Sequence, residues 1–322
     1  MRIVILDGYT LSQGREVWGS IAAQGTLTVH DRTSADQIVD RLRDADVALT
    51  NKVPLRQDTL ERLPSLRYVA VLATGYNCVD VDAARRRGIP VSNVPEYGTD
   101  SVAQMTFALL LELCHHAGDH DLAVKEGAWS SSPDWCFWRH PLQELSGLKM
   151  GIVGFGRIGR KVGDIAHAFG MEVLAAARSR TSAPSYQPFA WKSVSEIFET
   201  ADVVSLHCPE TPETRGFVTS ALLGRMKKSA LLLNTARGTL IDEPALAAAL
   251  DQGLLAGAAL DVVSQEPIRP DNPLLRAKNC LLTPHLAWAT EAARHRLIHE
   301  TAGNLAAFRE GRPRNVVNGA KP

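Results

Sequence analysis

Three residues of this chain have side chains that together could bind a keto acid and supply the proton for its reduction. Arg237, Glu266 and His285 each stand a few residues past a short apolar run. An arginine guanidinium is a planar, permanently charged group that suits a carboxylate. A histidine can give a proton to a carbonyl oxygen while a hydride reaches the carbon, and a nearby carboxylate orients the ring and favours its charged form. The trio therefore predicts interconversion of 2-keto and 2-hydroxy acids.

A glycine-rich turn predicts the source of the hydride. Gly154, Gly156 and Gly159 form G-x-G-x-x-G between the apolar run MGIV and a helix-like segment. In dinucleotide-binding folds the first glycine makes a tight turn, the second admits the pyrophosphate and the third packs the helix on the strand. The helix N-terminus adds unpaired N–H groups and a positive dipole end. We therefore predict a nicotinamide dinucleotide as cofactor.

The end of the next apolar run bears on which dinucleotide binds. An Asp or Glu about 20 residues beyond the glycines usually binds the ribose hydroxyls and repels a 2′-phosphate. This chain has Ala177 in that region, followed by Arg178, Ser179 and Arg180. Two guanidiniums and a hydroxyl suit a phosphate group. The sequence thus favours NADP(H) over NAD(H), and the alternative is a solvated arginine pair with relaxed selectivity.

The elements that position these residues follow an α/β pattern. Short apolar runs alternate with helix-like segments, which is typical of doubly wound parallel sheets. Six strand candidates follow residue 149, as in a six-stranded nucleotide-binding domain. Ligands of such sheets bind at the carboxyl ends of the strands, so the trio can converge. A nearly all-apolar segment starting at Thr99 or Asp100 predicts a helix buried all round, at a domain or subunit interface.

Composition excludes several other classes of protein. The 322-residue chain has 35 Lys plus Arg and 35 Asp plus Glu, and this balance argues against nucleic acid as a main partner. Five widely spaced cysteines without a C-x-x-C pair argue against a disulfide framework or structural zinc. His295 and His299 lack an evident third ligand, so no metal is expected. Without a leader segment or a membrane-spanning run, we predict a cytoplasmic protein with no membrane association.

The chain resembles the D-isomer-specific 2-hydroxyacid dehydrogenase family over essentially its whole length. The motifs that carry the resemblance are, in order, GIVGFGRIG, LHCPETPETRG, LLNTARG, ALDVVSQEP, NPLL and TPHLAWAT. Within the family, TNKVPL and PEYGTDSVAQ resemble the glycerate dehydrogenase and hydroxypyruvate–glyoxylate reductase branch. The resemblance implies two Rossmann-like or flavodoxin-like domains with an active-site cleft between them. It assigns residues 1–99 plus 288–322 to substrate and 100–287 to the dinucleotide, and it implies a homodimer.

The same resemblance assigns roles to individual residues. Arg237 would bind the substrate, Glu266 would support the reaction, and His285 would act as acid and base. The implied substrate-binding residues are Asn51, Lys52, Ala73, Thr74, Gly75, Trp138 and Trp288. Trp138 would close the partner subunit's pocket, or else simply pack at an interface. Besides the glycines and Arg178–Arg180, the implied cofactor-binding residues are Arg157, Ile158, Cys208, Pro209, Thr214, Ala236 and Asp261.

Two alternatives share this fold. Dinucleotide-sensing co-repressors resemble these enzymes and carry the same trio, but this chain lacks long charge runs or tails for docking. Enzymes acting on formate or phosphite are the second alternative, and formate dehydrogenases generally have Gln where this chain has Glu266. We therefore predict hydride transfer between NADP(H) and a small 2-keto or 2-hydroxy acid. Hydroxypyruvate/D-glycerate and glyoxylate/glycolate are the expected pairs.

Overall fold

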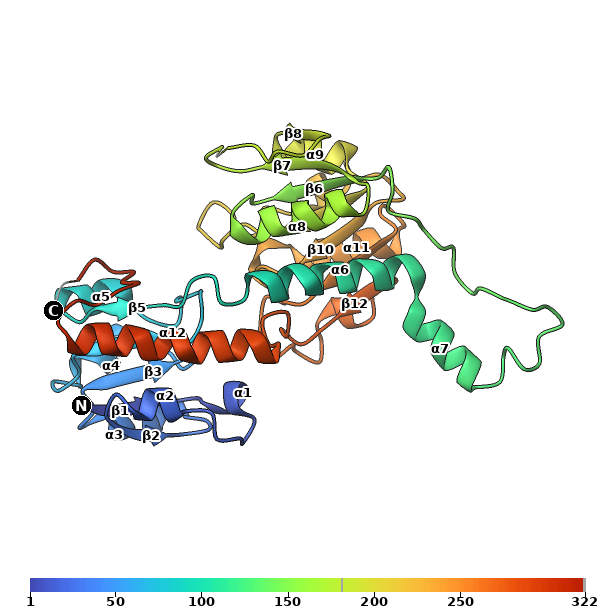
Figure 1. The fold of residues 1–322 in the computed structure, drawn as a ribbon. Helices are drawn as coiled ribbons and strands as arrows, with labels where there is room; N and C mark the ends of the chain where they lie inside the picture. Colours follow the sequence, from blue (N-terminus) through green and yellow to red (C-terminus); the bar gives the residue numbers. More distant parts are fainter. Residues whose placement is uncertain (181, 321–322) are drawn as a thin grey trace. The chain divides into compact units, whose positions relative to one another are not determined.

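The computed structural model describes residues 1–180 and 182–320, and the chain divides into two compact units. Unit 1 comprises Met1–Gly98 with Ala289–Pro322, and unit 2 comprises Thr99–Trp288 (Figure 1). Each unit has its own parallel sheet with helices packed on it. The predicted α/β class with two parallel sheets is therefore confirmed.

Unit 1 contains a five-stranded parallel sheet in the order β2-β1-β3-β4-β5. Its strands are β1 (Arg2–Ile5), β2 (Thr26–Val29), β3 (Val47–Thr50), β4 (Tyr68–Val71) and β5 (Val91–Ser92). Its helices are α1 (Tyr9–Ser12), α2 (Gly19–Ala22), α3 (Ile38–Leu42), α4 (Gln57–Glu61), α5 (Val81–Arg86) and α12 (Glu291–Arg309), with the 3-10 turn η1 (Ala35–Gln37). The strand order reverses between β1 and β3, as in flavodoxin-like folds.

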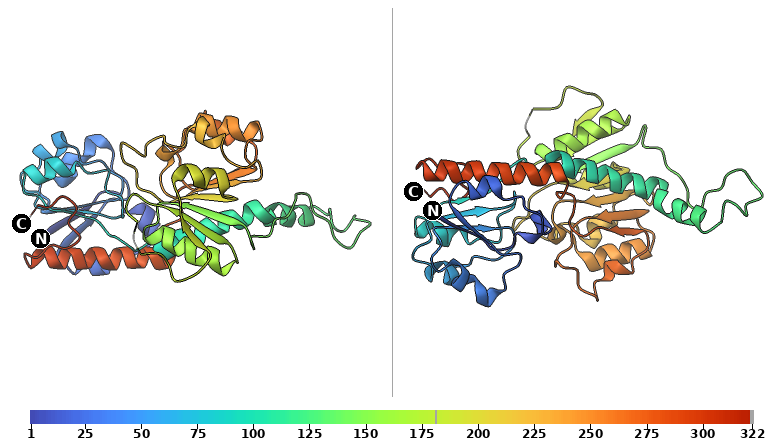
Figure 2. Two further views of the ribbon diagram at one scale, coloured as in Figure 1. Left: turned by 90° about the horizontal axis from the view of Figure 1, so that it is seen from above. Right: turned by 60° about the horizontal axis from the view of Figure 1, so that its bottom comes forward.

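The C-terminal helix completes the core of unit 1. Both faces of β3 and β4 are buried, which explains their continuous apolar sequences. Thr290 caps the start of helix α12, because its side chain accepts a hydrogen bond from the N–H of Ala293. Phe308 near its end stacks on Tyr68 of β4, with ring centroids 4.3 Å apart. Figure 2 shows α12 running along the unit that holds the N-terminus.

Unit 2 contains a seven-stranded parallel sheet in the order β12-β11-β10-β9-β6-β7-β8. Its strands are β6 (Lys149–Val153), β7 (Glu172–Ala176), β8 (Phe189–Trp191), β9 (Val203–Leu206), β10 (Leu231–Asn234), β11 (Gly257–Leu260) and β12 (Cys280–Leu282). Its helices are α6 (Thr99–His115), α7 (Ala117–Lys125), α8 (Arg157–Ala168), α9 (Val194–Thr200), α10 (Ser220–Leu223) and α11 (Glu243–Asp251), with 3-10 turns η2 (Gly238–Leu240) and η3 (Pro273–Leu275).

Two features of unit 2 differ from the sequence-based expectation. The sheet has a seventh strand, β8, at its edge, where three half-buried residues pair with β7. Such a short edge strand lacks the long apolar run that marks the central strands. Helix α6 buries one face within the unit, while Leu111 and Leu113 stay partly exposed and Ala108 is exposed. Within this chain the helix is therefore not buried all round.

The membrane prediction can be compared with one structural observation. No helix in the described part of the chain combines the length and the apolar character needed to cross a bilayer.

Candidate functional site

Glu266 and His285 lie in direct hydrogen-bond contact. His285 Nδ1 is 2.6 Å from Glu266 Oε2, although the residues are 19 positions apart. Because a carboxylate only accepts hydrogen bonds, the hydrogen resides on Nδ1, and Nε2 is the nitrogen that can exchange a proton. The N–H of Val263 donates to the other carboxylate oxygen at 3.3 Å and so fixes the glutamate.

The backbone of His285 is held in an unusual conformation. Its φ is 52°, in the left-handed region, and its N–H donates to the carbonyl of Asp261 at 2.8 Å. A bulky residue in this region costs about 1–3 kcal/mol and persists only where the surroundings enforce it. The Asp261 carboxylate, 1% exposed, accepts from the Thr283 hydroxyl (2.6 Å) and from the N–H groups of Leu286 (2.9 Å) and Ala287 (2.8 Å). Asp261 therefore positions the histidine loop, a role that the sequence did not reveal.

Arg237 occupies a turn whose backbone is held by the buried side-chain amide of Asn234. The side chain of Asn234 is fully buried, and it donates to the carbonyl of Arg237 (2.8 Å) while accepting from the N–H of Ala236 (3.0 Å). The next residue is Gly238, where a Cβ would lie 1.9 Å from the carbonyl carbon of Val263. Only glycine permits this approach, so the arginine turn lies directly against the segment that leads from β11 towards Glu266.

The trio thus comes from the carboxyl ends of three neighbouring strands. Arg237 follows β10, Glu266 follows β11 and His285 follows β12, and these strands are adjacent in the sheet. The carboxyl ends of parallel strands are where ligands of such sheets bind. The structure therefore brings Glu266 and His285 into contact and places the Arg237 turn beside the loop that carries the glutamate.

The three glycines of the first turn have distinct surroundings. Gly154 has a φ of 100°, and a Cβ there would lie 2.4 Å from the backbone nitrogen of Cys208. A Cβ on Gly159 would lie 2.2 Å from the carbonyl oxygen of Gly154. A Cβ on Gly156 would meet nothing within 4 Å, so this residue faces open space.

The N-terminus of α8 completes the same turn. Gly156 is the N-cap residue and makes no side-chain cap hydrogen bond, and Arg157 and Ile158 are the first residues of the helix. The positive dipole end at a helix start favours a negatively charged group. The open space at Gly156 and the helix start beside it together fit a dinucleotide pyrophosphate.

The residues predicted to choose between dinucleotides lie at the end of β7. Ala177 is half-buried, and Arg178, Ser179 and Arg180 are exposed. Three groups lower the pKa of the Glu213 carboxyl: first the side chain of Thr211, then a backbone N–H, and then the charge of Arg178. The last contribution places Arg178 near the loop that follows β9.

That loop contains Cys208, Pro209 and Thr214 and forms a closed turn. The Thr214 hydroxyl donates to the carbonyl of Pro209 at 2.8 Å, and it accepts from the N–H of Thr211 at 2.7 Å. Burial raises the pKa of the Cys208 thiol to about 11, so the thiol stays protonated near neutral pH. Cys208 therefore contributes shape and backbone to the turn rather than a nucleophile.

The substrate residues predicted in unit 1 follow two neighbouring strands. Asn51 and Lys52 come directly after β3, with Asn51 buried and Lys52 exposed. Ala73, Thr74 and Gly75 come after β4, and the Thr74 hydroxyl donates to the carbonyl of Val94 at 2.9 Å. Because β3 and β4 pair in parallel, both segments leave the same edge of the sheet.

The two predicted tryptophans have different surroundings. Trp288 is half-buried at the end of unit 2. Trp138 is 66% exposed and lies on the segment of residues 116–143, which projects from the body of unit 2 (Figure 2). Trp129 and Trp135 on this segment are 52% and 86% exposed. Within this chain the structure therefore does not bring Trp138 to the trio.

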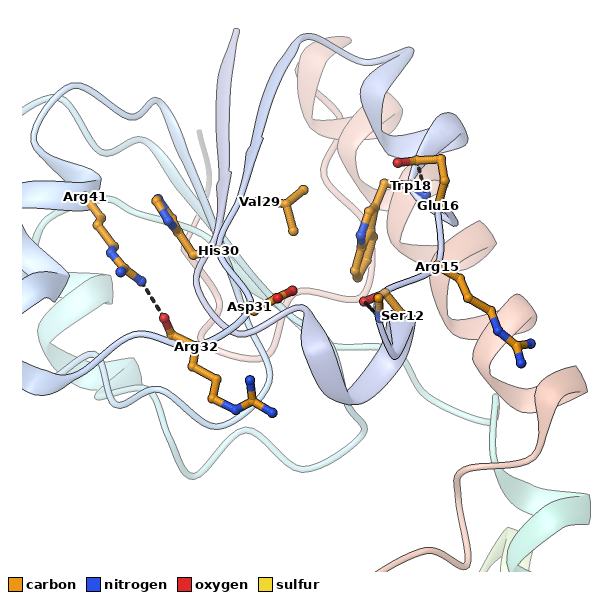
Figure 3. Close-up of a pocket in the computed structure, with 10 residues that line it drawn as sticks. Ser12, Arg15, Glu16, Trp18, Val29, His30, Asp31, Arg32 and Arg41 are labelled. Carbon is orange, nitrogen blue, oxygen red and sulfur yellow. Dashed lines mark hydrogen bonds between the residues drawn. The ribbon is translucent and has the colours of Figure 1, made fainter.

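Unit 1 also has an open cavity of about 690 Å³ near the end of β2. Figure 3 shows it between the turn that carries Ser12 and the segment that carries Asp31. Its lining residues are Ser12, Gly14, Arg15, Glu16, Trp18, Val29, His30, Asp31, Arg32 and Arg41. Arg41 donates to the carbonyl of Arg32 at 2.6 Å, and burial, followed by the charge of Arg41, lowers the pKa of His30. None of the predicted site residues lines this cavity.

Comparisons with known proteins cover the whole chain. The model of the family described as "D-isomer specific 2-hydroxyacid dehydrogenase, NAD binding domain" matches residues 107–287, more than half of the sequence. The chain is 49% identical to a hydroxypyruvate reductase of Blautia hydrogenotrophica over 321 residues, which cover 99% of this chain and 100% of that protein. It is 38% identical to a glycerate dehydrogenase of Methylorubrum extorquens over 284 residues, 88% of each chain.

One solved structure extends the comparison to three dimensions. It is an NADPH-dependent glyoxylate/hydroxypyruvate reductase of Sinorhizobium meliloti in complex with NADP and malonate. This chain is similar to it with a TM-score of 0.83 and 28% identity, over 99% of this chain and 98% of that chain. These findings confirm the predicted family resemblance.

Proposed function

The chain belongs to the D-isomer specific 2-hydroxyacid dehydrogenase family, and we propose that it reduces hydroxypyruvate and glyoxylate with NADPH. Membership makes the chain an oxidoreductase with a nicotinamide dinucleotide as cofactor, as predicted. The similar proteins named above act on these keto acids or on glycerate by their names. The observation that carries the proposal is the 2.6 Å contact between His285 and Glu266 at the ends of β12 and β11.

His285 supplies the proton of the reaction. A dinucleotide held at the glycine turn would supply the hydride to the keto carbon. The protonated His285 gives the hydrogen on Nε2 to the carbonyl oxygen, so that the keto group becomes a hydroxyl group. Glu266 keeps Nδ1 protonated throughout and stabilises the positive charge of the ring before the transfer. The net reaction consumes one keto acid, one NADPH and one proton, and it yields one hydroxy acid and one NADP⁺.

The carboxylate of the substrate orients it for this transfer. We assign its binding to the Arg237 guanidinium, whose turn is fixed by the buried Asn234. The role of the Ala73–Gly75 backbone stays a prediction. A bidentate contact between guanidinium and carboxylate provides both attraction and orientation. A fixed turn reduces the loss of side-chain entropy when the substrate binds.

NADPH is the proposed form of the cofactor because of the residues after β7. No carboxylate stands at Ala177 to bind the ribose hydroxyls, and Arg178, Ser179 and Arg180 are exposed and available to a 2′-phosphate. Asp261 and Ala236 are proposed to lie at the nicotinamide, and Cys208, Pro209 and Thr214 beside the adjoining ribose.

We also propose that the protein is a homodimer. The segment of residues 116–143 exposes Leu122, Trp129, Trp135 and Trp138 by 52% or more. Monomeric proteins rarely leave so much apolar surface on one segment, and a second copy of the chain would cover it. Closure of the partner's site by Trp138 stays a prediction, as does a cytoplasmic location.

The proposed function is tested by the absorbance decay of NADPH and, separately, of NADH with hydroxypyruvate or glyoxylate. We expect rapid oxidation of NADPH and slower oxidation of NADH with either keto acid. Equal rates with both dinucleotides would contradict the role of Arg178–Arg180 and leave the reaction intact. No oxidation of either dinucleotide would contradict the proposed substrates and favour the co-repressor alternative.

A further inference from the structure

Asp7 binds three successive N–H groups of another loop. Its Oδ1 accepts from the backbone of Asn51 at 2.8 Å, and its Oδ2 accepts from Lys52 at 2.6 Å and Val53 at 3.1 Å. Successive N–H groups that converge in this way form a cradle for an anion, and the anion here is a side chain of the same unit. Hydrogen bonds to a charged acceptor are stronger than neutral ones, so the loop is held in one conformation.

Further contacts hold the side chain and carbonyl of Asn51. Its Nδ2 donates to the Thr10 hydroxyl at 3.2 Å, and its carbonyl accepts from the Cys78 thiol at 3.6 Å. Burial, and then the charge of Asp7, raises the pKa of the Cys78 thiol to about 11, so the thiol remains a donor. Asp7 therefore fixes the backbone of the loop, and Thr10 and Cys78 fix the side chain and the carbonyl of Asn51.

The position of Asp7 in the sheet connects it with ligand binding. The strand order of unit 1 reverses between β1 and β3. In doubly wound sheets, ligands bind outside the carboxyl ends of the strands at this reversal. Asp7 follows β1, and the loop that it binds follows β3, so the carboxylate spans the reversal. The cavity of Figure 3 lies on the other side of β1, near β2.

We infer that Asp7 is a positioning residue for the keto acid. It holds the Asn51–Val53 loop in the conformation in which Asn51 and Lys52 contact the substrate, without touching the substrate itself. This inference rests on the proposed function, because it concerns the binding of the same keto acid. Its consequence is specific: loss of Asp7 weakens substrate binding and leaves dinucleotide binding in unit 2 unchanged.

Asp46 offers a matched control within the same pair of strands. Its Oδ2 accepts from the N–H of Arg2 at 2.6 Å, at the amino ends of β1 and β3. Asp7 and Asp46 thus tie the same two strands together at opposite ends with the same type of bond. Only the Asp7 end lies where ligands of such sheets bind.

The experiment compares Asp7→Asn with Asp46→Asn by steady-state kinetics with hydroxypyruvate and NADPH. In Asp7→Asn the amide oxygen can still accept from the N–H of Asn51. The amide NH₂ group then faces the N–H groups of Lys52 and Val53, and two donors cannot form a hydrogen bond. We expect the KM for hydroxypyruvate to rise about tenfold, with kcat and the KM for NADPH within about twofold. Asp46→Asn should leave all three within about twofold. Asp7→Glu, which keeps the carboxylate, should recover part of the loss.

An unchanged KM for hydroxypyruvate in Asp7→Asn would overturn the inference, and so would an equal rise in Asp46→Asn. If the wild-type protein reduces no hydroxypyruvate, the proposed function fails on its own. Amide hydrogen exchange at residues 51–53 then tests separately whether Asp7 holds the loop. Faster exchange in Asp7→Asn alone supports the positioning role, and unchanged exchange overturns it.

Discussion

The turn after β1 in unit 1 and the turn after β6 in unit 2 occupy the same topological place in their sheets. They differ in the residue that meets the neighbouring loop. In unit 1 the turn after β1 places the Asp7 carboxylate against three N–H groups of the loop after β3. In unit 2 the turn after β6 places Gly154 against the backbone of Cys208, directly after β9. Each turn lies where its strand order reverses. The first turn brings a negative charge to its neighbour, whereas the second places a glycine, without a side chain, against its neighbour.

This difference explains how one topology supports two roles. A carboxylate at the reversal accepts hydrogen bonds from the N–H groups of the neighbouring loop, so that this loop is held in one conformation. Glycines at the reversal place no capping side chain before α8, so that an external anion can approach the positive end of the helix. Under the proposed function, unit 1 shapes a loop for the substrate, whereas unit 2 binds the dinucleotide and supplies the reacting groups.

The largest expected effect concerns the strand ends of unit 2. His285→Ala removes the proton donor and should lower kcat about 10³-fold, and Glu266→Gln should lower it less, because general acid catalysis contributes roughly 10²–10⁴-fold. NADPH oxidation with hydroxypyruvate measures both variants. His295→Ala is the control, since His295 is exposed on α12. A wild-type kcat in His285→Ala would contradict the division of roles between the units.

The next effect concerns the arginines beyond the glycine turn. The double change Arg178→Ala with Arg180→Ala should raise the KM for NADPH by about 100-fold or more, because each of the two lost charge-assisted hydrogen bonds contributes roughly 1.5–3 kcal/mol. The KM for NADH should stay the same. Arg269→Ala, which removes an exposed guanidinium paired with Asp271, is the matched control. An equal rise for both dinucleotides would mean that the arginines do not bind a 2′-phosphate.

A smaller effect separates two glycines of the same turn. Gly156→Ala places a methyl group in open space and should leave Tm unchanged. It should weaken the binding of both dinucleotides about tenfold, because the backbone must approach the pyrophosphate at this position. Gly154→Ala places a methyl group 2.4 Å from the backbone nitrogen of Cys208, at a residue whose φ is 100°, and should lower Tm. Calorimetry and dinucleotide titration test the pair. Unchanged affinity in Gly156→Ala would place the pyrophosphate elsewhere.

The smallest effect is on the pH dependence of protein stability, and it concerns His207 near the glycine turn. Burial lowers the pKa of His207 from 6.5 to about 3, and its Nε2 lies 2.8 Å from the Ser205 hydroxyl. Unfolding below pH 6.5 therefore takes up a proton, so stability falls as the pH falls towards 3, by about 1.4 kcal/mol per unit. His207→Gln should lose about 2 kcal/mol less than wild type between pH 6.5 and 5, as followed by urea unfolding. Parallel losses in both proteins would refute the assignment.

Local sequence determined the fold class and the residue types of the candidate site. Alternating apolar and helix-like runs predict parallel sheets, and the glycine spacing marks the turn after β6 because that turn is built from adjacent residues. Arg237, Glu266 and His285 are recognisable because each follows an apolar strand. The two-sheet fold and the oxidoreductase class were predicted correctly from these features, and the family was predicted correctly from the resemblance of the motifs.

The tertiary structure alone decided which distant residues hold the site in place. Asp7 binds a loop 44 or more positions away, and Asp261 binds the histidine loop 22 to 26 positions away. In the sequence Asp7 reads as an ordinary acidic residue after an apolar run, and the family resemblance assigned Asp261 to the cofactor rather than to the histidine loop. Their partners depend on which strands lie side by side, and long-range packing, rather than local propensity, determines strand order. The sequence therefore shows which residues can react, and the fold shows which residues hold them.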